Sequence, residues 1–97
     1  MNLLVMIPET AKEALFKERL EKETKKWIEK MRAERGRIIL RESERTDFID
    51  NIDAYISDSE YFLQSGELVE AFEAAIWAWA YLEIGKDLGF FDLKKHE

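Results

Sequence analysis

The stretch Ala74-Ala75-Ile76-Trp77-Ala78-Trp79-Ala80-Tyr81-Leu82 decides how this chain folds. It holds no charged or amide side chain, and on an α-helix it would make about two and a half turns. Apolar side chains therefore point in every direction around the helix axis. A single neighbouring element would leave Trp and Tyr rings in water, so the stretch predicts a helix that is covered on nearly all sides.

The flanking residues predict two further helices. Apolar residues recur about every 3.6 positions over 8–35 and 45–64, and the central stretch extends into a helix over 67–88. Because only Ser65-Gly66 separates the last two, these helices must lie antiparallel as an αα-hairpin. We therefore predict an all-α three-helix bundle, one domain over residues 1–97, with a long charged first helix packed on the hairpin.

Capping signals stand at the expected helix ends. Thr10 and Glu13 match a capping box at the start of the first helix. Ser, Thr and Asp cluster over 43–47, which indicates an N-cap for the second helix. Gly36 and Gly89 follow the first and third helices, where glycine commonly ends a helix. These signals predict where each helix begins and ends.

Two segments stand outside the helical pattern. Residues 37–41 (Arg-Ile-Ile-Leu-Arg) have strand character, but no second strand pattern is present to pair with them. We therefore expect a connector that inserts Ile38 and Leu40 into the bundle. The apolar residues 2–7 lack the basic flank and cleavage site of a signal peptide and are expected to dock on the fold. No segment has the roughly 18–20 apolar residues of a membrane span, so no membrane contact is predicted.

Charge and composition narrow the class of protein. Residues 1–45 carry 12 basic and 9 acidic side chains, whereas residues 46–97 carry 3 basic and 12 acidic ones, for a net charge of −6. We expect the basic half to pair with the acidic half of the same fold. Lys, Arg and Glu are abundant and cysteine is absent, a thermophile-like composition that fits a reducing cytoplasm.

The hairpin also carries a spaced sequence pattern. It reads Tyr55-x2-Asp58-x3-Phe62-x3-Gly66-x4-Ala71-x3-Ala75-x2-Ala78-x3-Leu82-x2-Gly85-x3-Gly89. Over residues 45–91 it resembles a small archaeal family known only as domain of unknown function 357, and it departs from that family at Ala80 and Glu83, where Gly and Asp are usual. The resemblance implies an all-helical, archaeal, cytoplasmic protein and implies no activity.

No catalytic constellation is recognisable in the sequence. His96, the sole histidine, is the penultimate residue, so no serine has a nearby histidine to activate it. The glycines stand singly and form no phosphate loop. Without cysteine, zinc with nitrogen and sulfur ligands is excluded. We predict a protein that is not an enzyme and that has no cofactor.

Two groups of carboxylates follow helical spacing. They are Asp47, Asp50 and Asp53 in one helix, and Glu70 and Glu73 in the next. Three-residue spacing places neighbours on one helix face, where oxygen ligands would suit Mg²⁺ or Ca²⁺. Helical metal centres normally draw on several helices and include histidine, which is missing here. A solvated acidic face is the better interpretation, and no metal ligand is predicted.

Four apolar residues of the third helix form the first candidate for a binding surface. Trp77, Tyr81, Ile84 and Leu88 follow a 4-3-4 spacing and so share one helix face. A three-helix monomer has difficulty in burying this face together with the opposite one. We therefore predict a homodimer, or a docked protein partner, through these four residues. The alternative is simple burial under the first helix and residues 2–7.

A basic segment over residues 25–45 is the second candidate. Its cations are Lys25, Lys26, Lys30, Arg32, Arg35, Arg37, Arg41 and Arg45, and four glutamates lie among them. Such clusters bind phosphates, and Trp27 would suit stacking on a base. The interleaved acids and the net charge of −6 oppose nucleic-acid binding and favour a salt-bridged surface. An RNA-associated protein therefore stands as the alternative function.

Overall fold

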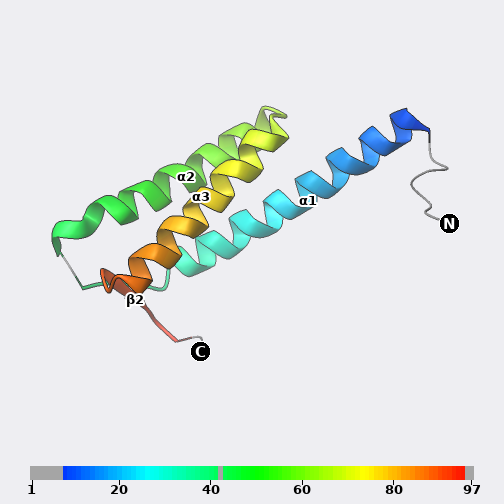
Figure 1. Ribbon diagram of the computed structural model, residues 1–97. Coiled ribbons are helices and arrows are strands. Elements are labelled where there is room, and N and C mark those ends of the chain that lie inside the picture. The colour runs from blue at the N-terminus through cyan, green and yellow to red at the C-terminus, as the bar shows by residue number, and fades with distance from the viewer. Residues whose placement is uncertain (1–7, 42, 96–97) are drawn as a thin grey trace.

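The computed structural model of the chain describes residues 8–41 and 43–95. Three helices dominate it: α1 spans Glu9–Arg35, α2 spans Thr46–Gln64 and α3 spans Leu68–Asp87. The hairpin of α2 and α3 lies along α1 (Figure 1). The predicted all-α, three-helix architecture is confirmed. The expected docking of the apolar N-terminal segment and the interpretation of the histidine near the C-terminus fall outside the described residues.

The hairpin packs through the small residues of α3. The buried residues of this helix are Ala71, Ala74, Ala75, Ala78, Leu82 and Gly85. Small side chains allow two helix axes to approach closely, so α2 and α3 make the tightest helix pair. The hydroxyl of Ser59 in α2 is fully buried and donates a hydrogen bond of 2.6 Å to the carbonyl of Ala71. This bond satisfies the one polar side chain that α2 buries.

Both hairpin helices end at a glycine with left-handed backbone. The φ angle is 77° at Gly66 after α2 and 78° at Gly89 after α3, a region in which other residues are strained. At the end of α3 the amide of Phe90 donates to the carbonyl of Gly85, and the amide of Gly89 donates to that of Lys86. These two bonds make a Schellman motif, and the predicted stop at Gly89 is confirmed.

The predicted capping chemistry is wrong at the other helix ends. Thr10 lies inside the first turn of α1, whose N-cap is Pro8, and no side chain caps this helix. Gly36 follows α1 as predicted but has a right-handed φ of −66°, so no left-handed residue is needed there. The short 3₁₀ helix η2, Ser43–Arg45, leads directly into α2. The N-cap of α2 is Arg45, whose side chain makes no capping hydrogen bond. Helix α2 therefore continues directly from η2, and neither α1 nor α2 has the expected side-chain cap.

The prediction of a connector at residues 37–41 is also wrong. Strand β1, Ile38–Leu40, pairs antiparallel with β2, Phe91–Leu93, and Ile39 lies opposite Asp92. Figure 1 shows this pair at the end of the hairpin opposite its turn. Ile38 packs against the core as expected, whereas Leu40 is exposed. The partner strand is three residues long and contains an aspartate, too short for alternation to reveal it.

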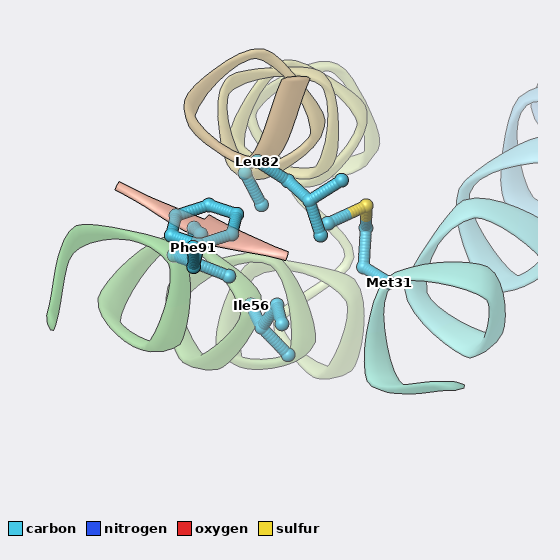
Figure 2. Close-up of a cluster of buried hydrophobic side chains, with 6 residues drawn as sticks. Met31, Ile56, Leu82 and Phe91 are labelled. Carbon is cyan, nitrogen blue, oxygen red and sulfur yellow. The ribbon is translucent and has the colours of Figure 1, made fainter. Parts of the chain in front are cut away.

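The core forms where the strand pair meets all three helices. Its buried members are Met31, Ile52, Ile56, Ala78, Leu82 and Phe91. Figure 2 shows Met31 of α1, Ile56 of α2, Leu82 of α3 and Phe91 of β2 pointing toward one another. A residue from the C-terminal strand thus closes a core that the helices alone would leave open.

The N-terminal part of α1 lies outside this core. The buried residues of α1 are Thr24, Ile28 and Met31, and none occurs over residues 9–23. We call residues 9–23 the α1 arm. In Figure 1 the arm projects past the turn of the hairpin. It does so because α1 has 27 residues against 19 and 20 in the hairpin helices, an excess of about 11 Å or more.

Candidate interaction surfaces

The predicted interface residues of α3 form an aromatic stripe, which we define as Trp77, Tyr81, Ile84 and Leu88. Trp77 is 51%, Ile84 50% and Leu88 59% exposed, whereas Tyr81 is half-buried. Three of the four are therefore not buried under α1, and burial under residues 2–7, the other part of the alternative, lies outside the described residues. Exposed apolar side chains that gather on one helix face mark an interaction surface more often than scattered ones do.

Residues of α2 hold one edge of the aromatic stripe in place. Tyr55 stacks on both Trp77 and Tyr81, with ring centroids 6.2 Å and 5.6 Å apart. Phe48 meets Tyr81 edge-on at 5.3 Å. Aromatic pairs of this kind contribute about 0.5–1.5 kcal/mol each beyond the area they bury. Contacts with α2 therefore fix the orientation of the Trp77 and Tyr81 rings.

The opposite side of α3 is covered by α1. Trp79 makes a T-shaped contact with Trp27 of α1, with centroids 5.8 Å apart, and the ammonium of Lys30 lies 4.8 Å from the Trp27 ring centre. Helix α3 thus packs on α1, on α2 and on β2. The apolar run at its centre needs all three neighbours, and the aromatic stripe is the part that they leave open.

The basic segment pairs with acids from distant parts of the fold. The pairs are Arg32 with Glu60, Arg35 with Asp53 and Arg41 with Asp92. Nε of Arg35 lies 2.6 Å from Oδ1 of Asp53. The pKa of Arg32 is raised because its guanidinium donates hydrogen bonds to the Glu60 carboxylate. The expected pairing between the basic and acidic halves of the chain is present in these three contacts.

The other candidate nucleic-acid contacts also have partners within the chain. Lys25 pairs with Glu21 at 2.9 Å, Lys26 with Glu23 at 3.6 Å and Arg37 with Glu34 at 2.8 Å. Arg37 also donates to the carbonyl of Lys94. Lys30 completes the set through its contact with the Trp27 ring. These contacts within the chain offset part of the positive charge of the segment.

The carboxylates of α2 likewise bind cations of the same chain. Arg45 donates to both oxygens of Asp47, and these hydrogen bonds hold the pKa of Asp47 below its usual range. The Arg45 guanidinium also lies 4.2 Å from the ring centre of Phe90. Asp53 is occupied by Arg35. Over residues 8–41 and 43–95, no three acidic or histidine side chains converge as metal ligands would.

An apolar groove lies between the α1 arm and the start of α3. Its volume is about 670 Å³, and its lining residues are Lys12, Leu15, Phe16, Arg19, Leu20, Glu23, Val69 and Phe72. Phe16 is 77% and Val69 63% exposed. Leu15 and Phe16 follow the apolar spacing of the first helix, yet both are exposed. The greater length of the first predicted helix was the sequence signal that could have revealed the overhang.

The described helices include none that combines the length and the apolar character needed to cross a bilayer. Fold and surfaces define a small all-α protein built from an αα-hairpin, a longer preceding helix and an exposed aromatic stripe. The chain belongs to the family described as protein of unknown function (DUF357), whose model matches residues 19–91. This result confirms the resemblance seen in the hairpin pattern.

One solved structure is similar to this chain. It is the crystal structure of protein AF1782 from Archaeoglobus fulgidus, described with the same family. The two sequences are 46% identical, the alignment covers 81% of this chain and 99% of that chain, and the TM-score is 0.73. A comparison with curated proteins gives no match. The family match begins at Arg19, so most of the α1 arm precedes it.

Proposed function

We propose that this protein is a non-enzymatic helical interaction module that acts in the cytoplasm and associates with a second copy of itself through the aromatic stripe. The observation that carries the proposal is the exposure of Trp77, Ile84 and Leu88 along one face of α3. Fully burying a large apolar side chain is worth roughly 1.5–3 kcal/mol, so covering these three favours association. Two-fold homodimers are the commonest oligomers, which favours a second copy over another protein.

The charged residues support a role without catalysis. Strongly perturbed pKa values in a cleft are typical of catalytic acids and bases. Here the pKa of Asp47 is lowered by the neighbouring exposed Arg45, and the pKa of Arg32 is raised by Glu60 on the surface of the bundle. Both shifts have the ordinary cause of a surface ion pair. The absence of cysteine fits a cytoplasmic location.

Substituting Trp77→Glu together with Leu88→Glu tests the aromatic stripe. We expect the wild-type protein to contain two or more copies per particle and the variant's mass to fall at least twofold. The reason is that two carboxylates cannot be buried in an apolar contact without large cost. Light scattering coupled to size exclusion measures the mass, and circular dichroism should show unchanged helix content, since both side chains are half exposed or more.

The matched control is Tyr61→Glu, which removes an equally exposed aromatic ring from α2. This variant should keep the wild-type mass, because Tyr61 does not belong to the aromatic stripe. A wild-type protein that is monomeric at every concentration measured would contradict the proposal. Equal mass of the wild-type protein and the double variant would exclude the stripe as the contact.

RNA association through residues 25–45 has less support, because each candidate cation already has a partner within the chain. We expect no salt-sensitive retention on a heparin column. Phosphate contacts release counterions, so true binding weakens steeply as salt rises. Elution should therefore stay near the void volume between low and high salt. Strong retention at low salt that disappears as salt is added would instead favour the RNA-associated function.

A further inference from the structure

Six of the residues that line the groove come from the α1 arm, and they mirror one another about the midpoint between Lys17 and Glu18. Lys12 mirrors Glu23, Leu15 mirrors Leu20, and Phe16 mirrors Arg19. A cation at one end thus corresponds to an acid at the other, with three apolar residues and Arg19 between them. Such a surface is complementary to its own copy when the two run in opposite directions.

We propose that the groove binds the α1 arm of a second copy, which lies antiparallel with the two midpoints side by side. In this register Lys12 of each copy faces Glu23 of the other, so the symmetry produces two ion pairs. Leu15 of one copy then lies beside Leu20 of the other, and Phe16 lies along the aliphatic stem of Arg19. The opposite charges at the ends fix the register, because sliding either copy would separate both pairs.

The exposed state of the arm supports this occupant. Phe16 has the most exposed side chain among the large apolar residues described, and the arm over residues 9–23 buries none of its residues. An isolated helix of about this length is marginal in water, so a partner along its apolar side stabilises it. Val69 and Phe72 form the wall of the groove on the α3 side and would cover the incoming helix.

The charged ends of the groove are available for exchange. In the single chain Lys12 pairs with Glu9 at 3.2 Å, and Glu23 pairs with Lys26 at 3.6 Å. In each pair the two residues are one helical turn apart, and the glutamate side chain is well exposed. Ion pairs of this kind contribute little to stability. Exchanging them for contacts with a second copy therefore costs little. The new pairs would form at the edge of an apolar contact, where screening by solvent is weaker.

This contact is separate from the aromatic stripe. On α3 the groove is lined by Val69 and Phe72 near the start of the helix, whereas the aromatic stripe extends from Trp77 to Leu88. If both contacts form, the wild-type particle contains more than two copies. Each contact can then be removed on its own, so the failure of one proposal is distinguishable from the failure of the other.

The first test uses the full chain carrying Trp77→Glu and Leu88→Glu, in which the aromatic stripe cannot contribute. We expect this protein to remain dimeric by sedimentation equilibrium. Adding Lys12→Glu places two acids opposite each other at both ends and should weaken the dimer about tenfold or more. Adding Glu23→Lys as well reverses both pairs and should restore the dissociation constant to within about threefold of its starting value.

The second test needs no charge change at the ends of the arm. The chain has no cysteine, so a single engineered one reports on its own surroundings. Arg19→Cys lies close to the two-fold midpoint on the groove side and should form a disulfide-linked dimer under mild oxidation. Lys17→Cys is nearer still to the midpoint but does not line the groove, and it should remain monomeric on a non-reducing gel.

Two results would overturn the arm contact. One is a monomeric stripe variant beside an oligomeric wild-type protein, which would support the aromatic stripe alone. The other is equal crosslinking of Arg19→Cys and Lys17→Cys together with no rescue by Glu23→Lys. A stripe variant that keeps the full wild-type mass, and loses it when Lys12→Glu is added, would instead support the arm and reject the stripe.

Discussion

Replacing Phe91 with alanine is expected to lower the free energy of unfolding by about 3–5 kcal/mol. The Phe91 ring is fully buried in a core cluster to which all three helices contribute, so its loss leaves a large cavity. It also removes the anchor that holds β2 against the bundle. Urea denaturation followed by circular dichroism measures the change. Domains of this size have roughly 5–15 kcal/mol of stability, so the expected loss is a large fraction of the total.

The matched control for Phe91→Ala is Ile39→Ala on the paired strand. Ile39 is exposed and lies opposite Asp92, so its truncation creates no cavity and should cost less than about 1 kcal/mol. Equal losses for the two variants would contradict the placement of Phe91 in the core.

Gly85→Ala is expected to destabilise the protein although alanine favours helices. A Cβ atom at Gly85 would lie 2.6 Å from Cζ of Phe91 and 3.2 Å from Cδ1 of Phe48. The Phe91 ring is enclosed on all sides and cannot move away without disturbing the core. Overpacking of this kind costs about 1–3 kcal/mol, against about 1 kcal/mol gained in helix propensity. We therefore expect a net loss, measured by the same urea denaturation.

Gly36→Ala provides the control for Gly85→Ala. Gly36 has right-handed backbone, and a Cβ atom there would come no closer than 3.5 Å to its nearest neighbour. This variant should be neutral or more stable by about 0.4–1 kcal/mol, because alanine restricts the unfolded chain. A double-mutant cycle sharpens the result: Gly85→Ala should cost clearly less when Phe91 is already leucine. An unchanged cost would mean that the two residues do not compete for space.

Local patterns were sufficient to predict the helices. The spacing of apolar residues and the glycines after α2 and α3 depend on neighbours close in sequence. The all-round apolar run over 74–82 further required that α3 be covered by more than one element, and it is. The predicted side-chain cap of the first helix is wrong. Helix α1 already begins at Glu9, so Thr10 lies inside its first turn and cannot be the N-cap.

The candidate surfaces, too, were predicted only in part from the sequence. The spacing of Trp77, Ile84 and Leu88 placed them on one face of the helix, but only the positions of α1 and α2 decided that this face stays open. The excess of basic residues before residue 46 indicated pairing within the fold. It did not identify the partners, since Arg32 and Glu60 are 28 residues apart. Long-range partners depend on how the helices cross, which no local pattern records.

The sequence by itself determined three helices, their hairpin connection and the residues that share each helix face, because these follow from interactions within a few positions. Only the tertiary structure decided that β2 pairs with β1, because the two strands are more than 50 residues apart along the chain. It likewise decided that Phe91 lies against Gly85, because this contact depends on how the chain turns back after the end of α3. It also decided which part of the long first helix extends beyond the hairpin, namely the arm over residues 9–23. The physical reason is that pairing and packing reward complementary shape, which exists only after the helices have assembled.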